Sequence, residues 1–325
     1  MRKIVTVLTI VIFITLAYFT FNSARRVVGF EWQEPLPISQ IEPQHRLVLI
    51  TQEIDTPFWD AVAKGAQAQA EKDQAIIEVL GNYGHNEEDF LRNLELAIYS
   101  RVDGIIVQGL DTEAFKELTK IKAAFYSIPI ITIANDVPIE ESLRRTYVGS
   151  DQYQAGQLLA QQLINDMGSK GQVAILYDQQ QYYFQQQRAL GIESVLTEYP
   201  NIEVILADTI NTREDIVSTT QQLLNEFPDI DAVIAINANI VSGMVQEISR
   251  RRQMESIYLY SFDDHTDIEG LLEQGKLNAV LKQAPEEMGR CSVQLIIEWL
   301  NGETVPLDFD GYHTKIEIGK AKDQL

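Results

Sequence analysis

The chain has little of what redox and nucleic-acid-binding proteins need. Its one cysteine, Cys291, excludes a disulfide within the chain and any CxxC zinc or redox motif. Lys and Arg total 26 against 47 Asp and Glu, a formal net charge of −21. Because such a charge repels polyphosphate backbones, we expect no nucleic-acid partner.

Signatures of common enzymes are also missing. The sequence contains no GxSxG, HExxH, P-loop or GxGxxG pattern. One acidic cluster, Asp263-Asp264-His265-Thr266-Asp267, combines carboxylates with an imidazole, which can bind a divalent ion. Asp residues also cap helix N-termini, and this interpretation of Asp264 and Asp267 is the one we favour. We therefore expect no metal, no cofactor and no catalysis, and keep a metal-dependent or carbohydrate-active enzyme as the alternative from a different class.

A long uncharged run stands near the N-terminus. Residues 4–21 (IVTVLTIVIFITLAYFTF) contain only apolar side chains and four threonines, close to the length that spans a bilayer. A cleavable signal segment remains an alternative, but the cleavage pattern around Ala24 is poor and no cysteine follows that could accept a lipid. We predict that residues 1–28 form one transmembrane anchor and that the body lies on the extracytoplasmic side of the cell membrane.

The rest of the chain alternates short apolar runs with helical stretches. Residues 29–45 carry three prolines and no periodicity, which is typical of a linker. From Arg46 onward about ten apolar, β-branched runs alternate with helix patterns, and runs that are apolar at every position predict parallel strands buried on both faces. The fold class is therefore α/β, with two similar doubly wound, Rossmann-like lobes, because ten strands exceed one ordinary sheet.

Polar and aromatic side chains follow several of these strands, and ligands of open α/β sheets bind at the carboxyl ends of strands. The amides and carboxylates suit vicinal hydroxyl groups, and an aromatic ring suits the C–H face of a sugar. We therefore expect the Trp59 ring to cover ligand rather than core. Strand ends predict these residues: Thr56, Phe58, Trp59, Asn135, Asn237, Asp263 and Gln283.

Seven segments, in order, carry a resemblance to a known family. They are TPFWDAVAKGAQAQA (56–70), RVDGIIVQG (101–109), IPIITIAND (128–136), YVGSDQYQAGQLLAQQL (147–163), AVIAINANIVSGM (232–244), YLYSFDDHTDI (258–268) and LKQAPEEMG (281–289). From Arg46 to the C-terminus the chain resembles type I periplasmic binding proteins of the ribose/galactose class, which share their core fold with LacI-type regulators.

The resemblance implies roles for single residues. Phe58 and Trp59 match the aromatic pair that sandwiches a sugar ring, and Thr56 stands where ribose binders have asparagine. Asn237, Asp263 and Gln283 match positions that bind sugar hydroxyls. Two matches depart from the ribose pattern, because Ala134-Asn135 replaces Asp-Arg and Gln186 replaces a sugar-binding arginine, which argues against ribose itself.

The resemblance also implies domains and a mechanism. One lobe comprises residues 46–147 and 284–309, the other 148–283 and 310–325, with three crossovers that form a hinge and close around a monosaccharide. Two functions remain open. The first is a co-receptor for a membrane sensor histidine kinase, which the uncleaved anchor favours. The second is the binding component of a sugar ABC transporter, which serves a permease. A LacI-type regulator is excluded, since an apolar segment stands where a DNA-binding helix-turn-helix belongs.

Overall fold

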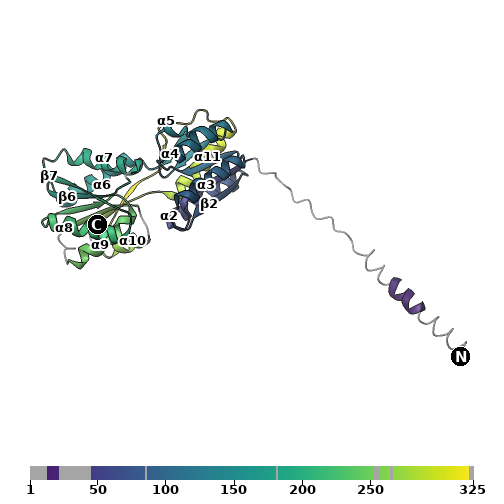
Figure 1. Ribbon diagram of the computed structural model, residues 1–325, viewed down its shortest axis with the longest axis horizontal. Helices are drawn as coiled ribbons and strands as arrows, with labels where there is room; N and C mark the ends of the chain where they lie inside the picture. Colours follow the sequence, from purple (N-terminus) through teal and green to yellow (C-terminus); the bar gives the residue numbers. More distant parts are fainter. Residues whose placement is uncertain are drawn as a thin grey trace, which may run out of the picture. The chain divides into compact units, whose positions relative to one another are not determined.

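The computed structural model describes residues 13–21, 45–84, 86–180, 182–251, 257–263 and 266–321 (Figure 1). Residues 1–42 and 43–325 are separate compact units. In the first unit, residues 13–21 are helical and exposed, whereas residues 4–12 of the predicted membrane segment lie outside the described part. Among the helices described, none has both the length and the apolar character needed to cross a membrane. Residues 29–44 of the predicted linker also fall outside it.

The second unit alternates strands and helices almost without exception. Its strands are β1 (Arg46–Glu53), β2 (Ile76–Asn82), β3 (Gly104–Gln108), β4 (Ile130–Ile133), β5 (Thr146–Gly149), β6 (Lys170–Asp178), β7 (Asn201–Thr209), β8 (Ala232–Ala235), β9 (Tyr258–Phe262), β10 (Ala279–Lys282), β11 (Tyr312–His313) and β12 (Glu317–Lys320). Its helices are α2 (Pro57–Lys72), α3 (Glu87–Tyr99), α4 (Glu113–Glu117), the π-helix η1 (Leu118–Ala123), α5 (Ile139–Ser142), α6 (Gln152–Met167), α7 (Tyr183–Leu196), α8 (Arg213–Glu226), α9 (Ala238–Arg250), α10 (Thr266–Glu273) and α11 (Pro285–Leu300).

The strands form two sheets with the same topology. The orders are β11-β5-β4-β3-β1-β2 in the first lobe and β12-β10-β9-β8-β6-β7 in the second. The first five strands of each lobe pair in parallel, so their carboxyl ends meet at one edge. The predicted α/β fold with two doubly wound lobes is confirmed.

Helices cover both faces of each sheet, and this explains the uninterrupted apolar strands. In the first lobe Leu47 and Leu49 face the core under α2 and α11, whereas Val48 and Ile50 face the core under α3 and η1. All four are nearly or fully buried. The edge strands β2 and β7 are only partly buried.

The chain crosses between the lobes three times. The crossovers follow β5, β10 and β11, because β11 pairs in parallel with β5 of the first sheet and β12 pairs antiparallel to β10 of the second. The sequence placed residues 310–325 with the second lobe, whereas this pairing carries the first sheet to His313. A strand of two residues leaves no apolar pattern to detect.

Candidate functional site

A cavity of about 250 Å³ lies at the carboxyl ends of the strands, between the two lobes of the second unit. Seven of the eight residues predicted for the site line it: Thr56, Phe58, Trp59, Asn135, Asn237, Asp263 and Gln283. The other residues that line it were not among the eight predicted contacts: Gln52, Glu53, Gln108, Gly109, Leu110, Ala134, Asp178, Tyr182, Phe184, Gln185, Arg188, Asn211, Ala238 and Asn239.

Gln186 does not lie on the cavity wall. It is exposed, whereas its neighbours Phe184, Gln185 and Arg188 line the cavity. In an α-helix each residue turns the side-chain direction by about 100°, so the phase of α7 decides which side chains face inward. Gln185 is 3% exposed and its Oε1 accepts a hydrogen bond from the amide of Asp178.

The start of α2 presents the two aromatic residues. The Thr56 hydroxyl caps this helix by accepting from the amide of Trp59, and Pro57 occupies the first turn. The Phe58 and Trp59 rings pack edge to face at 5.3 Å. Trp59 is only 8% exposed and belongs to the first-lobe core. We expected the Trp59 ring to cover ligand rather than core, and this was wrong in part. The ring lines the cavity and is also packed in the core.

A pair of glutamines forms the first-lobe wall beside the aromatic residues. Gln108 Oε1 accepts from the Thr51 hydroxyl at 3.1 Å and from the Gln52 amide at 2.9 Å. Within the described part of the chain, Gln52 Nε2 is buried without a hydrogen-bond acceptor. Because an unmet buried donor is costly, this amide is suited to an acceptor that enters the cavity.

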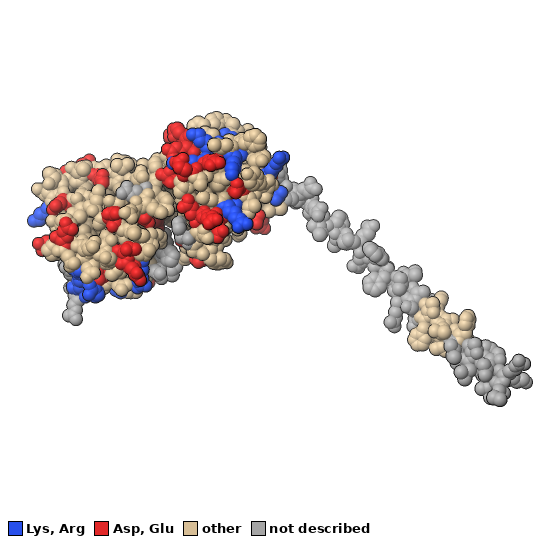
Figure 2. Space-filling view, in the orientation of Figure 1, with Lys and Arg blue, Asp and Glu red and all other residues tan. Residues whose placement is uncertain are grey.

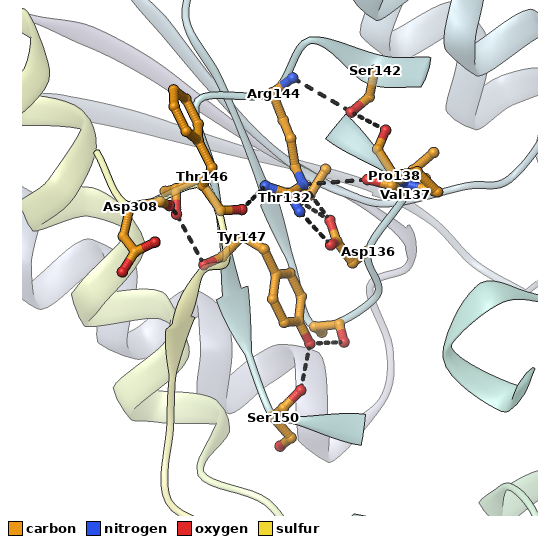
Figure 3. A network of polar contacts seen from close by, with 12 residues as sticks. Thr132, Asp136, Val137, Pro138, Ser142, Arg144, Thr146, Tyr147, Ser150 and Asp308 are labelled. Atoms are coloured by element: carbon orange, nitrogen blue, oxygen red, sulfur yellow. Dashed lines mark hydrogen bonds and ion pairs between the residues drawn. The ribbon is translucent and has the colours of Figure 1, made fainter. Parts of the chain in front are cut away.

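Asn135 follows a turn that a buried polar network holds in place (Figure 3). Ala134 has φ +64°, which turns the chain after β4. Arg144 donates from its NH2 group to Asp136 Oδ2 at 2.7 Å and from NH1 to the Phe309 carbonyl at 2.9 Å. The Tyr147 hydroxyl lies 2.9 Å from the Ala134 carbonyl oxygen, and burial raises the pKa of this hydroxyl, which keeps it a donor. Three hydrogen bonds therefore hold the backbone around Asn135 in place.

The second lobe repeats this turn after β9. Asp263 has φ +66° and occupies the position in that lobe that Ala134 occupies in the first. Arg188, 2% exposed, donates to both carboxylate oxygens of Asp263 at 2.9 and 3.0 Å. It also donates to the Ile236 carbonyl and, from Nε, to Gln152 Oε1 at 2.7 Å. This arginine is therefore held as a structural partner of Asp263.

Gln283 joins the cavity floor to the hinge. It lies on the second crossover, where its Nε2 donates to Asp263 and its Oε1 accepts from the hydroxyl of Ser150, a residue of the first crossover. On the third crossover, the Thr314 amide donates to the Gly149 carbonyl at 2.8 Å. The crossovers are thus tied to one another beside the cavity.

Tyr182 and Phe184 provide the aromatic wall of the second lobe. From the sequence alone, the aromatic cluster Tyr182, Tyr183 and Phe184 could face a partner, cover the cavity or begin a helix. Tyr182 and Phe184 line the cavity with rings stacked at 6.2 Å, and Tyr183 begins α7. Tyr182 also packs against the first-lobe core that includes Val48. Burial, with Asp178 nearby, raises the pKa of Tyr182 to about 12, so the hydroxyl stays protonated.

The charge of the cavity is negative. Glu53, Asp178 and Asp263 line it, and among the described lining residues Arg188 alone is basic. The acidic cluster that the sequence raised as a metal candidate continues into Asp264 and His265, which lie outside the described residues. Elsewhere in the described part no group of three acidic, His or Cys side chains is placed to hold a metal.

Comparison with known families decides the class. Residues 47–304 match the periplasmic binding protein domain. The chain belongs to this family. Among curated relatives of this periplasmic binding protein, the ribose import binding protein RbsB of Bacillus subtilis is 22% identical over 276 residues, which is 85% of this chain and 88% of the relative.

Solved structures of similar fold include sugar-binding proteins. The crystal structure of GanP, a glucose-galactose binding protein from Geobacillus stearothermophilus, is 30% identical with a TM-score of 0.79, covering 86% of this periplasmic binding protein and 98% of GanP. The XylFII–LytSN complex contains a chain 24% identical with a TM-score of 0.74, covering 86% of this chain and 98% of that one. The second likeness shows the fold alone.

Proposed function

We propose that this periplasmic binding protein is an extracytoplasmic receptor whose two lobes close around one neutral monosaccharide. The observation that carries the proposal is the lining of the cavity, which combines amides and carboxylates with two aromatic pairs from opposite lobes. Amide groups both donate and accept toward hydroxyls, and aromatic faces suit the C–H face of a sugar ring. We assign ligand contacts to Thr56, Phe58, Trp59, Asn135, Asn237, Asp263 and Gln283.

The size and charge of the cavity narrow the ligand class. Small-molecule sites run from roughly 300 to 1,000 Å³, so a cavity of about 250 Å³ suits a single sugar unit better than an oligosaccharide. Arg188 is committed to Asp263 and Gln152, and no other basic side chain among the described lining residues is placed to bind a phosphate or carboxylate. A neutral ligand therefore fits better than a sugar phosphate or sugar acid.

The three crossovers supply a hinge. Asp263 and Gln283 line the cavity and contact each other, and Gln283 accepts from Ser150 at the hinge. A sugar that bonds to both lobes stabilises the closed arrangement by its differential contacts. In this proposal no bond of the sugar is broken, in keeping with relatives that are named as binding proteins.

The uncharged run of residues 4–21 supports a membrane anchor with the body outside. For a receptor of this kind we favour a sensing role, in which the sugar-bound form is recognised by a membrane sensor histidine kinase. Support comes from the XylFII–LytSN complex, in which a chain of this fold assembles with a second protein. Delivery of sugar to an ABC permease is the second candidate, and the import role named for RbsB favours it.

Ligand binding is tested by thermal unfolding of the protein with a panel that begins with glucose and galactose and continues through other hexoses, pentoses and polyols. A ligand at a hundred times its Kd adds about 2.7 kcal/mol of stability. Asn135 lines the cavity and is only partly buried, so Asn135→Ala should weaken affinity about tenfold and barely change unfolding without sugar.

The matched control for this substitution is Gln186→Ala, because Gln186 lies near the cavity but not on its wall. It should bind as the parent does. If no sugar or polyol shifts unfolding, or if Gln186→Ala weakens binding as much as Asn135→Ala, the proposed site is wrong.

The two roles are separated in a strain that lacks this protein. If the protein is a sensor, its deletion abolishes the transcriptional response to sugar. Sugar uptake stays intact in that strain when the transporter is expressed from a constitutive promoter. Loss of uptake under the same conditions would support delivery to a permease and contradict the sensing role.

A further inference from the structure

Aromatic and basic side chains gather at one edge of the first lobe. Three cation–aromatic contacts lie there: Arg101 over Tyr126 at 5.3 Å, Lys122 over Tyr99 at 5.9 Å and Arg145 over Trp299 at 4.6 Å. The Tyr126 ring also packs edge to face on Tyr99 and on Phe125, at 6.2 and 5.1 Å. We call the part formed by α3 and η1 the edge patch, which comprises Tyr99, Arg101, Ile121, Lys122, Phe125 and Tyr126.

The edge patch lies at the end of the sheet opposite the cavity. Tyr99 ends α3 shortly before β3 begins, and Phe125 and Tyr126 come shortly before β4. Because β1, β3 and β4 are parallel, the starts of all three strands share this edge. The Asp103 amide donates to the carbonyl of Arg46, the first residue of β1, at 2.9 Å. The chain therefore enters the lobe beside the patch.

The apolar members of the patch are exposed although the fold does not require it. Phe125 is 79% exposed, Ile121 63% and Tyr99 53%. Single exposed apolar residues are ordinary, but a connected group marks an interaction site. Lys122 is paired with Glu95 at 2.7 Å, whereas Arg101 is exposed. On the face drawn in Figure 2, basic side chains of the first lobe stand among acidic ones.

The second lobe has a different surface at the matching position. Its topology makes α8 the counterpart of α3. Helix α8 ends with exposed Glu226 and is followed by exposed Asp229, whereas α3 ends with Tyr99 and is followed by Arg101. Glu198, after α7, is exposed as well. Basic side chains occur at this edge of both lobes, since α9 ends with exposed Arg250 followed by Arg251. Among the described residues, the packed cluster of exposed aromatic rings at this edge lies in the first lobe, which receives the N-terminal segment.

We propose that the edge patch rests on a membrane surface that contains anionic lipid. Aromatic side chains favour the headgroup region of a bilayer, and Lys and Arg extend toward lipid phosphates. The chain as a whole carries a formal net charge of −21 and is repelled by such a surface. The face that the protein turns toward the membrane therefore depends on where its basic and aromatic side chains gather. The proposal rests on the anchor of the proposed function, and it directs the sugar cavity away from the bilayer.

The length of the connecting segment permits this contact. Residues 22–44 join the apolar run to the described body, and a link of this length spans at most roughly 80 Å when fully stretched. A body tethered within this distance can bring the edge patch to the membrane. The edge patch supplies the orientation of the body.

The experiment uses the full chain in vesicles of phosphatidylglycerol and phosphatidylcholine. In a Cys291→Ser background, Phe125→Cys and, as the matched control, Leu190→Cys each carry a fluorescent label. Leu190 is 51% exposed on the second lobe. Quenchers attached to the lipid headgroups should quench the label at position 125 about threefold more than the label at position 190. This difference between the two labels should shrink in phosphatidylcholine alone or at high salt. Equal, weak quenching at both positions would overturn the proposal.

A second arm separates the patch from the anchor. Residues 43–325, one compact unit, are mixed with the same vesicles, and binding is measured by vesicle flotation. The variant combines Tyr99→Ser and Phe125→Ser. The unit should bind phosphatidylglycerol vesicles, and the double variant should bind about tenfold more weakly. If residues 4–21 are not an anchor, the full chain fails to insert although the unit still binds. If both the unit and its variant fail to bind, the membrane surface is not the occupant.

Discussion

At the scale of single residues, the neighbouring aromatic side chains Phe58 and Trp59 differ in how far they serve binding and folding. Phe58 and Trp59 both line the cavity, but Trp59 is 8% exposed and belongs to the core around Val62, whereas Phe58 is only partly buried. The N-cap at Thr56 fixes the start of the helix and so decides which ring points into the lobe. The pair therefore allows binding and folding to be separated by mutation.

We expect Phe58→Ala to weaken sugar binding with a small effect on unfolding, and Trp59→Ala to reduce both. Deleting a buried Trp costs about 3–5 kcal/mol, because burial energy is lost and a cavity remains. Chemical denaturation without sugar, with calorimetric titration of the sugar found by the thermal screen, checks both variants. Equal losses of stability in the two would contradict the division of tasks.

Asp263 shows why the choice of binding mutant matters. Removing its carboxylate leaves Arg188, 2% exposed, without its ionic partner, and breaking a buried pair in this way costs about 3–5 kcal/mol. Loss of binding in Asp263→Ala therefore mixes unfolding with lost contacts. Asn135 gives the cleaner test.

At the scale of helices and strands, glycines set the spacing of two equivalent helix pairs. In the first lobe α2 and α11 cross at Gly65 and Gly289, and in the second α7 and α6 cross at Gly191 and Gly156. A Cβ at any of these positions would overlap backbone of the facing helix. The two lobes thus share a packing feature that follows from their common topology.

Gly289→Ala should destabilise the protein by about 1–3 kcal/mol, because its methyl group would meet the Val62 carbonyl and the helices must separate. The control is Gly270→Ala in α10, where the added Cβ meets open space and helix propensity predicts a gain of up to about 1 kcal/mol. Urea denaturation of both variants measures the difference. A neutral Gly289→Ala would mean that α11 can shift without cost.

Patterns of several residues were predictable from the sequence, and shorter features were not. The apolar pattern predicts a strand over residues 104–108, which are the bounds of β3. The helical pattern predicts a helix over residues 112–126, and there α4 continues as the π-helix η1. Both β11 and β12 were missed, since they are short and depend on pairing with distant strands. Hydrogen bonds between turns of a π-helix likewise leave no mark in composition.

The sequence identified residues of the cavity lining where they directly follow a strand. Asn135 and Asn237 follow buried strands, so topology alone brought them to the cavity. The apolar pattern predicts a first strand over residues 47–51, and Gln52 was missed because β1 continues to Glu53. Gln108 was missed because it is the last residue of a strand rather than a residue that follows one. Gln186 was predicted as a contact because the resemblance indicates which helix borders the cavity. The resemblance does not indicate which side chains of that helix face the cavity.

At the scale of the whole molecule, the cavity draws its lining from both lobes, so ligand and lobe arrangement are linked. A sugar that contacts Asn135 of one lobe and Asn237 of the other favours the closed arrangement. We expect a saturating sugar to lower the radius of gyration measured by small-angle X-ray scattering. The Asn135→Ala variant should need a higher sugar concentration for the same decrease, and an unchanged radius would contradict closure.

The interleaved chain also imposes an order on biogenesis. The first lobe takes α11 from beyond the second lobe, and α11 buries Met288 and Ile296 in the core beneath α2. A chain that emerges N-terminus first therefore completes its second sheet up to β10 while the inner face of α2 still lacks its cover. The earlier-made lobe is therefore the later one to mature, and until residue 300 has been made its apolar face stays uncovered and prone to aggregation.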